Sequence, residues 1–393
     1  MFIDLHMHSR FSRACSGDIN LQNLESHARM KGIDVLATGD ITHPTWVKEL
    51  KSLDERDGLL VSKTGFHFFL SGEVSNIYQQ DGQSRRVHNL VLVRNFEILD
   101  AMNSELEKYG KLSSDGRPIL KMSSSQLIEA LKNIDRTIEV IPAHIWTPWF
   151  SVFGSKSGFD SIKDCFQDMA KHIFALENGL SADPQICSLI SGLDKYSIVS
   201  FSDSHSHWPL RIGREATNIE SDFSFEGIVG AMKGKNINNT VEFYPQEGKY
   251  HYDGHRNCRF SSHPSKTPKD GKCPRCGGAL TLGVLNRILE LADRETPVTT
   301  QRALHAIPLQ EIISFAFNSG PHGKAVWEEY EKAIHAFGSE FNVLFNAGEE
   351  ELKDVLEKRV HKALMSVRNG DVSITPGYDG EYGKLSVGGQ VRR

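Results

Sequence analysis

Two histidines one residue apart, His6 and His8, stand at the start of the chain with the spacing of metal ligands. The apolar Phe2, Ile3 and Leu5 around them predict a short buried strand, and alternate side chains of a strand share one face. Both imidazoles can therefore reach one metal ion. Burying two imidazoles without partners costs free energy. The pair alone is a weak signal, because two half-exposed histidines near a strand end need no function. Whether they bind a metal ion depends on the ligands that the rest of the chain supplies.

Most of the other predicted strands also carry a His, Asp or Glu residue at or near their ends. With the strand segments in parentheses, these residues are Asp40 and His43 (35–38), Glu73 (67–71), His88 (87–93), His144 (137–141), Glu177 (173–177), and Asp203 and His205 (198–202). In α/β barrels the loops at the C-terminal ends of the strands build the active site. An ordinary polar role in a loop explains single residues, Asp40, Glu177 and His207 in particular. The whole set predicts a metal centre.

A mixture of imidazole and carboxylate ligands suits transition metals, and the number of ligands predicts two or three divalent ions: zinc, manganese, magnesium or iron. Clustered divalent ions lower the pKa of a bound water and stabilise the charge that develops when a phosphate ester is hydrolysed. The chain contains no Gly-x-Ser-x-Gly motif, and the run 320–324 has too few residues between its glycines for a P-loop. These observations predict a metal-dependent phosphoesterase.

A second group of candidate ligands lies in the middle of the chain. The set is His255, Cys258, Cys273 and Cys276, which reads as H-x-x-C followed by C-x-x-C. This spacing is typical of one structural, tetrahedral zinc ion. His263, with His251 behind it, is the alternative fourth ligand. A disulfide between the last two cysteines is the competing interpretation, and a reducing compartment disfavours it.

The elements that must position these residues follow from the apolar patterns. Strand and helix patterns alternate up to about residue 218, which predicts an α/β fold with a largely parallel sheet. The number of units, about seven, fits a closed barrel better than an open sheet, which is the alternative. A last helix of this part is expected at 225–232. Helical patterns return at 282–292, 309–317, 326–337 and 349–369. We therefore expect a barrel domain at 1–245, a zinc-binding module at 246–283 and a mainly helical C-terminal domain at 284–393.

Length and charge limit the classes of function. With 393 residues the chain is too long for one ordinary core, and its net charge of −5 means that nucleic-acid affinity has to come from local patches or bound metal. Residues 246–276 contain seven Lys and Arg against three Asp and Glu, a local balance of +4. No apolar run has the length of a membrane span and no leader precedes the first strand, so we expect a cytoplasmic protein without membrane partners.

With these residues in view, the N-terminal part resembles the PHP (polymerase and histidinol phosphatase) family of metal-dependent phosphoesterases. This resemblance implies a distorted seven-stranded β/α barrel with a trinuclear metal site. The implied metal ligands are His6, His8, Asp18, His43, Glu73, His88, His144, Asp203 and His205, and the implied catalytic residues among them are Glu73, His144, Asp203 and His205. Asp18 lies ten residues after His8, and its alternative role is in the N-cap region of the following helix.

The order of barrel, basic zinc module and helical tail, with the segments 279–287, 291–294 and 376–383, is similar to the endonuclease Q family of DNA repair enzymes. The resemblance implies hydrolysis of the phosphodiester 5′ to deaminated bases (hypoxanthine, uracil, xanthine) and abasic sites, leaving 3′-hydroxyl and 5′-phosphate ends. Its implied partner is DNA with such lesions, with other repair proteins as further candidates. The implied location is the cytoplasm, in association with the nucleoid.

An aromatic loop at 146–153 directly follows His144, and we expect Trp146, Trp149 and Phe150 to contact an extruded base. A packed lid over the barrel is an equal alternative, because aromatic residues also dominate cores. In the zinc module, Arg256 and Arg275 are expected to contact DNA phosphates. Alternative functions with the same metals are a small-molecule phosphatase of the PHP type and a 3′-exonuclease. A non-catalytic DNA-binding scaffold is the alternative from another class.

Overall fold

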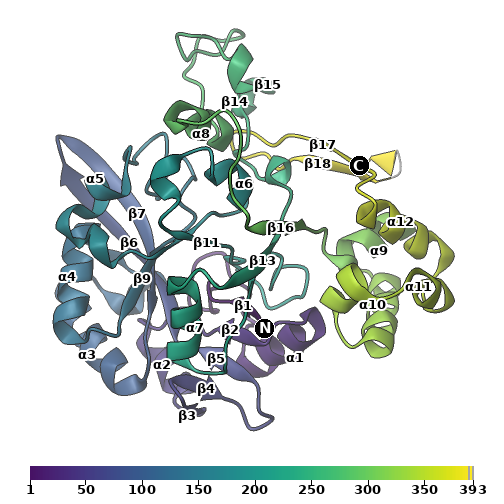
Figure 1. Cartoon of the computed structure of the whole chain (residues 1–393), viewed down its shortest axis with the longest axis horizontal. Coiled ribbons are helices and arrows are strands. Elements are labelled where there is room, and N and C mark those ends of the chain that lie inside the picture. Colours follow the sequence, from purple (N-terminus) through teal and green to yellow (C-terminus); the bar gives the residue numbers. More distant parts are fainter. Residues whose placement is uncertain (388–389, 392–393) are drawn as a thin grey trace.

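A ring of strands from three hydrogen-bonded sheets forms the N-terminal part of the chain (Figure 1). The structure, a computed structural model, describes residues 1–387 and 390–391. Around the ring, the strands are β1 (Phe2–Asp4), β2 (Val35–Ala37), β5 (His67–Phe69) continuing into β6 (Ser71–Gln80), β7 (Gln83–Leu92), β9 (Glu139–Pro142), β10 (Ala175–Glu177) and β11 (Ser197–Val199). The ring closes where Met7, after β1, pairs with Ser204, after β11. This is the distorted seven-stranded β/α barrel that the resemblance to the PHP family implied.

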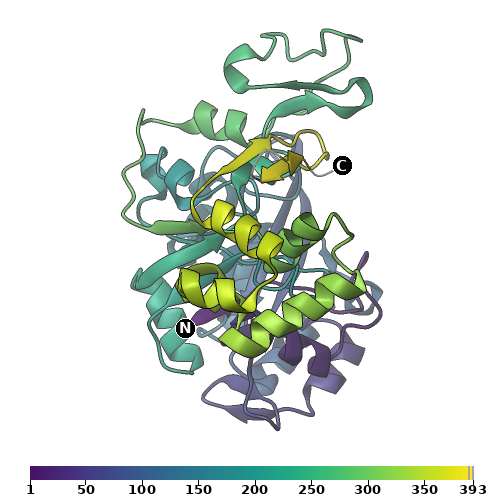
Figure 2. The ribbon, with the colours of Figure 1, turned by 90° about the vertical axis from the view of Figure 1, so that its right-hand side faces the viewer.

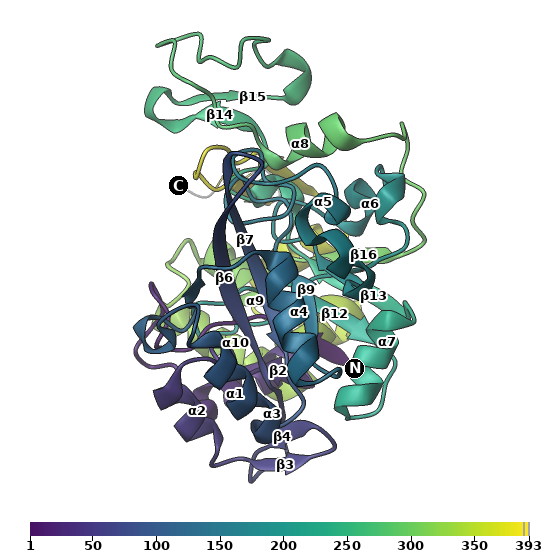
Figure 3. The ribbon, with the colours of Figure 1, turned by 90° about the vertical axis from the view of Figure 1, so that its left-hand side faces the viewer.

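One side of the ring is antiparallel, whereas a largely parallel sheet was expected. β6 pairs antiparallel with β7, and β7 with β9, while β1, β2 and β5 are parallel to one another. The turn between β6 and β7 consists of Asp81 and Gly82, both with positive φ (53° and 72°). Two such residues form the turn that joins antiparallel strands directly, so no helix intervenes. Figure 3 shows this long hairpin along one side of the barrel.

Helices cover the outside of the ring, and short strands extend its sheet. The helices are α1 (Leu21–Lys31), α2 (Pro44–Leu50), α3 (Phe96–Leu106), α4 (Ser124–Ile134), α5 (Ile162–Phe166), α6 (Pro184–Cys187) and α7 (Phe225–Lys233). The added strands are β3 (Asp54–Arg56), β4 (Leu59–Val61), β8 (Ile119–Leu120), β12 (Ala216–Ile219), β13 (Ile237–Glu242) and β16 (Arg302–His305). Helix α4 begins at a capping box in which Ser123 and Gln126 satisfy each other's backbone N–H groups.

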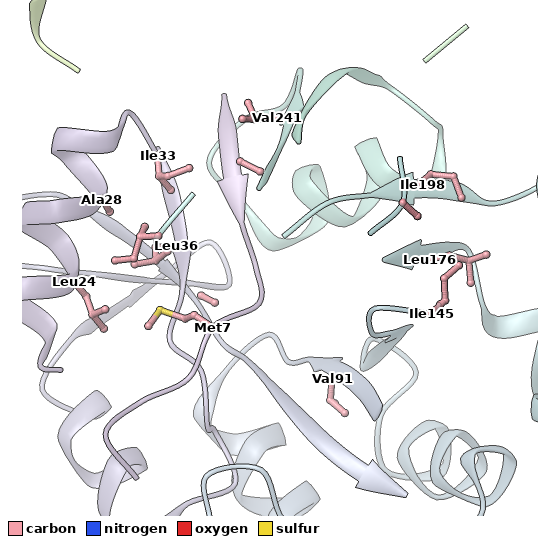
Figure 4. Packing of buried hydrophobic residues seen from close by; sticks show 14 of the residues in the cluster. Met7, Leu24, Ala28, Ile33, Leu36, Val91, Ile145, Leu176, Ile198 and Val241 are labelled. Atoms are coloured by element: carbon pink, nitrogen blue, oxygen red, sulfur yellow. The ribbon is translucent and has the colours of Figure 1, made fainter. Parts of the chain in front are cut away.

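The core of the barrel lies between the strands and these helices (Figure 4). Leu24 and Ala28 of α1 are fully buried and lie near Leu36 of β2 and Met7, which follows β1. Helix α1 carries apolar residues at a helical spacing, so one stripe of it faces the strands. This packing holds the segment after β1, with its two histidines, against the rest of the ring.

The second half of the chain forms a small hairpin module and a helical region (Figures 1 and 2). The module contains β14 (Asp253–His255) and β15 (Phe260–Ser262), followed by α8 (Val284–Leu291). The C-terminal elements are α9 (Leu309–Phe317), α10 (Lys324–Phe337), α11 (Glu349–Val355), α12 (Lys358–Arg368), β17 (Val372–Thr375), β18 (Lys384–Val387) and β19 (Gln390–Val391). The single helix expected at 349–369 is divided at Leu356, which has an extended backbone. The C-terminal region is mainly helical, as predicted.

The second half of the chain is tied to the barrel by backbone pairing, and the tail is tied to the module by hydrogen bonds. After the module, β16 pairs with β13 of the barrel sheet. Near the C-terminus, the carbonyl of Gly377 accepts a hydrogen bond from the N–H of Tyr252, and Asp379 accepts one from the N–H of Arg256. The domain boundaries expected at 245/246 and 283/284 stay predictions. None of the helices in the described part of the chain has the length and apolar character needed to cross a membrane.

Candidate active site and zinc cluster

Four candidate metal ligands meet at one end of the barrel. His6 and His8 follow β1, Glu73 lies near the start of β6, and Asp203 follows β11. One ligand atom from each lies within 4.8 Å of the others. His8 Nε2 lies 3.2 Å from Asp203 Oδ1 and 3.4 Å from Glu73 Oε2.

The donor atoms of this group fit a divalent metal ion. His6 Nε2, His8 Nε2 and Asp203 Oδ1 are buried and have no hydrogen-bond partner of good geometry. Buried polar atoms are almost always satisfied, so three unsatisfied atoms that lie close together fit a ligand held between them. Imidazole and carboxylate together are suitable ligands for zinc, manganese or iron.

A second group shares Glu73 with the first. His88 Nδ1 lies 2.8 Å and His144 Nε2 lies 2.9 Å from Glu73 Oε1, and these two ring nitrogens are 3.2 Å apart. His88 lies within β7, across the hairpin from β6, and His144 follows β9. A carboxylate common to two ligand groups can bridge two metal ions, which is the arrangement of two-metal hydrolytic sites.

Two buried carboxylates stand behind the histidines. Glu177 contacts Nδ1 of His6 with both carboxylate oxygens, at 2.9 and 3.0 Å, and accepts a hydrogen bond from the N–H of His144. Asp40 contacts Nδ1 of His8 at 3.0 Å. A carboxylate at Nδ1 fixes the tautomer and the ring orientation, which leaves Nε2 free for a metal ion. The sequence pattern predicted both residues at strand ends, with an ordinary polar role in a loop as the alternative. In the structure, each of the two carboxylates orients one histidine.

The backbone is strained at three of these positions. Asp40, His144 and Asp203 have positive φ values of 48°, 29° and 46°, and each follows a barrel strand. Residues with a Cβ rarely adopt such values, and the cost is tolerated mainly at functional sites. The strain turns the side chains of successive strand ends toward one centre.

Carboxylates dominate the electrostatics of the centre. Burial opposes the charge on His6, but Glu177 and Glu73 outweigh it and hold the pKa of His6 well above its ordinary value. Burial also opposes the charge on Glu73, yet interactions with His88, Arg117 and His6 hold the pKa of Glu73 well below its ordinary value. Burial lowers the pKa of His88 to about 4. At neutral pH Glu73 is therefore ionised, which is the form of a carboxylate that binds a metal ion.

Asp18 lies away from the two ligand groups. It is exposed in the loop before α1, and its carbonyl accepts hydrogen bonds from the side-chain amides of Asn20 and Asn23. Asn20 is the N-cap residue of α1. Asp18 therefore occupies the N-cap region that was its alternative role, and the structure does not bring it to the other candidate ligands.

His43 and His205 lie beside the groups without joining either. His43 is buried at the start of α2, and its ring stacks on Phe11 with 4.3 Å between the ring centres. His205 lies 4.4 Å from the ring of His8, and its Nδ1 is 3.0 Å from the carbonyl of Asp203. As metal ligands, both stay predictions.

One charged residue at the centre was missed by the sequence analysis. Arg117, in the loop before β8, donates from Nη1 to Glu73 Oε2 at 2.9 Å. The charge of Glu73 raises the pKa of Arg117. A single arginine in a loop belongs to no motif, so only the tertiary contact reveals it.

A cavity of about 390 Å³ opens beside His88, His144 and Asp203. Its other lining residues include Trp146, Thr147, Pro148, Trp149 and Phe150 of the aromatic loop, Asn178 to Ser181, Phe201, Val284, and Lys249 and Tyr250 from the start of the zinc module. Trp146 is buried and stacks on Phe153, whereas Trp149 is 36% exposed and meets Tyr250 edge to face. The loop thus serves partly as packing and partly as the wall of a cavity next to the candidate metal centre.

The second cluster of ligands also assembles. Ligand atoms of His255, Cys258, Cys273 and Cys276 lie within 4.8 Å of one another, which fits a structural zinc ion. The alternative ligands point elsewhere, since His251 Nδ1 contacts the carbonyl of Ser181 and His263 Nδ1 contacts Ser265. Arg256 and Arg275 are exposed on the same module. The cysteines are free thiols, so the disulfide interpretation is not supported.

A distorted β/α barrel that gathers histidines and carboxylates where its strands end defines a PHP-type metal-dependent phosphoesterase fold and site. Two solved structures match nearly the whole chain. The first is the lesion-specific endonuclease from Pyrococcus furiosus, with 33% identity, a TM-score of 0.86, and coverage of 98% of this chain and 95% of that chain. The second is endonuclease Q in complex with a 27-mer duplex carrying an abasic lesion, with 32% identity, a TM-score of 0.88, and coverage of 98% and 96%. The chain belongs to the endonuclease Q family.

Two further comparisons agree with this assignment. The protein MJ0043 of Methanocaldococcus jannaschii is 38% identical over 251 residues, which are 61% of this chain and 31% of that protein. The chain thus spans about a third of the length of this relative. Residues 308–371, which contain α9 to α12, match the family model of the MJ0043 C-terminal domain.

Proposed function

We propose that this protein is a DNA repair endonuclease that uses metal ions to hydrolyse the phosphodiester 5′ to deaminated bases (hypoxanthine, uracil, xanthine) and abasic sites. The observation that carries the proposal is the carboxylate of Glu73, shared by two groups of converging ligand atoms beside an aromatic cavity. Family membership supports a DNA substrate, because a relative was crystallised with a duplex that has an abasic lesion at its active site.

In this proposal, His6, His8, Glu73 and Asp203 hold one divalent ion, and Glu73 with His88 and His144 holds a second. His43 and His205 are the nearest candidates for a third. The ions, whether zinc, manganese, magnesium or iron, supply an activated water and stabilise negative charge on the phosphate oxygens. Glu177 and Asp40 keep the Nε2 atoms of two ligand histidines directed at the centre.

The cavity beside the centre takes the extruded lesion nucleotide. Trp149 and Phe150 offer ring surface for a base, and Lys249 and Tyr250 also line the cavity. Extrusion costs least where pairing is already weakened, as it is at a deaminated or abasic position. The flanking phosphodiester then lies at Asp203 and His144, which border both the cavity and the ligand groups. Cleavage leaves 3′-hydroxyl and 5′-phosphate ends.

The zinc module supplies a second contact with DNA. One structural zinc ion at the Cys3His cluster fixes the loop that exposes Arg256 and Arg275, whose guanidinium groups suit backbone phosphates. Other repair proteins are further candidate partners. A DNA substrate also implies that the protein is located in the cytoplasm, in association with the nucleoid.

The test uses a 5′-labelled duplex with one hypoxanthine, incubated with manganese or magnesium. A discrete nick directly 5′ of the lesion supports the proposal. Progressive shortening from the 3′ end supports an exonuclease instead, release of phosphate from small esters with intact DNA supports a phosphatase, and tight binding without cutting supports a scaffold. The variant Asp203→Ala should not cut but should still bind the duplex. The matched control Asp54→Ala, at an exposed acid far from the centre, should cut normally.

A further inference from the structure

Arg117 stands at the edge of the metal centre with most of its hydrogen-bonding capacity unused. Its Nη1 donates to Glu73 Oε2, and its side chain is 27% exposed. Among the described residues, no other acceptor contacts this guanidinium. A guanidinium has five N–H donors, so several of them are left for a ligand or for solvent.

The loop that carries Arg117 is fixed against the ligand shell. The backbone N–H of Arg117 donates to Asp115 Oδ1 at 3.0 Å. The preceding Gly116 packs so closely that a Cβ at this position would lie 2.1 Å from a carboxylate oxygen of Asp40. Asp40 in turn orients His8. The guanidinium is therefore held in a defined position relative to the candidate ligands.

Neutralising Glu73 does not by itself account for this placement. Glu73 is fully buried, and the divalent ions that the two ligand groups would hold would already compensate most of its charge. A residue needed only for that purpose has no reason to keep a partly exposed side chain beside the ligand groups. A planar guanidinium at the edge of a site that would hold divalent ions instead matches the non-bridging oxygens of a phosphate.

We propose that Arg117 binds a non-bridging oxygen of the scissile phosphate and stabilises the negative charge that grows there during hydrolysis. This inference rests on the proposed function. In the reaction, a water oxygen bonds to phosphorus, the bond from phosphorus to the 3′-oxygen breaks, and the proton from water ends on the 3′-hydroxyl. Arg117 exchanges no proton in this step and acts through charge and hydrogen bonds. Donors placed in this way contribute about 10²- to 10³-fold to a rate.

The first experiment compares Arg117→Ala with the wild type on a duplex that contains one abasic-site analogue. We expect kcat to fall about 10²- to 10³-fold, with the bound metal per chain, measured by mass spectrometry, unchanged. Arg117→Lys should recover part of the rate, because a single ammonium keeps the charge without the planar fork. The control is Arg13→Ala, which removes a 92% exposed arginine that also faces Asp115, and it should cut at the wild-type rate.

The second experiment replaces a non-bridging oxygen of the scissile linkage with a methyl group, separately in each stereoisomer. For each protein, the activity on each methyl-substituted stereoisomer is compared with the activity on the unmodified linkage. If Arg117 contacts the replaced oxygen, one stereoisomer reduces the activity of the wild type far more than it reduces the activity of Arg117→Ala. Equal losses in both proteins, or loss of metal from Arg117→Ala, would overturn the inference and leave only a structural role at Glu73. A wild type that nicks no lesion duplex overturns the proposed function instead. A wild type that nicks and an Arg117→Ala that nicks equally fast overturn this inference alone.

Discussion

Glu177 holds Nδ1 of His6 between its two carboxylate oxygens, at 2.9 and 3.0 Å, so that Nε2 of the same ring is turned toward Glu73 and Asp203. The pair is fully buried. A buried carboxylate behind a histidine is the usual support of a metal ligand. The orientation of the first histidine in the chain is therefore set by a residue at the end of β10.

Replacing this support should weaken metal binding without unfolding the protein. In Glu177→Gln the negative charge at Nδ1 of His6 is lost, and only one oxygen remains to accept a hydrogen bond. We expect the affinity for manganese to fall about 10- to 100-fold, measured by titration calorimetry. The exposed Glu220→Gln is the control. Unchanged manganese affinity in Glu177→Gln would contradict the orienting role.

The zinc cluster should contribute to stability and DNA binding separately from the centre in the barrel. Cys273→Ser removes one ligand, so we expect loss of one zinc ion per chain, a lower melting temperature and weaker DNA binding. Arg275→Ala leaves the ligands intact and should keep the zinc while weakening DNA binding. Metal analysis and fluorescence anisotropy measure the two effects. Full zinc content in Cys273→Ser would show that this cysteine is not a ligand.

Helix α8 is tied to the aromatic loop by Arg287. Its Nε and Nη2 donate to the carbonyls of Phe153 and Phe159, each at 3.0 Å. In Arg287→Lys one of these bonds is lost, and the cavity wall should move. We expect slower cutting at hypoxanthine and nearly unchanged cutting at an abasic site, where no base enters the cavity. Equal slowing on both substrates would indicate that the loop does not contact the base.

A buried ion pair joins the barrel to the helical region. Lys31 Nζ lies 2.7 Å from Glu340 Oε1, and both side chains are almost completely buried. Glu340→Gln leaves the ammonium without a counter-charge, so the free energy of unfolding should fall by about 3–5 kcal/mol. The exposed pair of Lys324 and Glu328 provides the control, and Glu328→Gln should cost less than about 1 kcal/mol. Urea unfolding measures both. Similar losses in the two variants would contradict the difference in burial.

Stability should depend on pH through a buried acid in β13. Burial raises the pKa of Glu242 from an ordinary value of 4.5 to about 8. In the folded protein the carboxyl group of Glu242 keeps its proton up to about pH 8. In the unfolded chain the same group loses its proton above about pH 4.5. Its contribution to stability is therefore complete below pH 4.5 and is lost as the pH rises to about 8.

The variant Glu242→Gln isolates this effect. Gln stays neutral at every pH. Between pH 5 and pH 8 the free energy of unfolding of the variant should therefore rise relative to that of the wild type. Urea unfolding at several pH values measures the difference, with the exposed Glu107→Gln as the control. A difference that does not change with pH would show that Glu242 is already ionised in the folded protein.

Much of the barrel could be predicted because its strands are short apolar runs that end in polar residues. Val35–Ala37 and Ala175–Glu177 lie within their expected segments. The β6 half of the hairpin was missed, because residues 75–80 are mostly polar and do not resemble a buried strand. The helix expected at 349–369 was too long, since its apolar spacing continues across the break at Leu356.

The sequence by itself determined the ligand types and the spacing of the zinc cluster, because both depend on short segments. It could not distinguish Glu177, which supports a ligand, from Asp18, which is exposed before α1. Only the tertiary structure decided that Glu177 meets His6, that Asp40 meets His8 and that Arg117 meets Glu73. These partners are 171, 32 and 44 positions apart. Their distances and burial result from the closure of the whole barrel, which no local pattern in the chain contains.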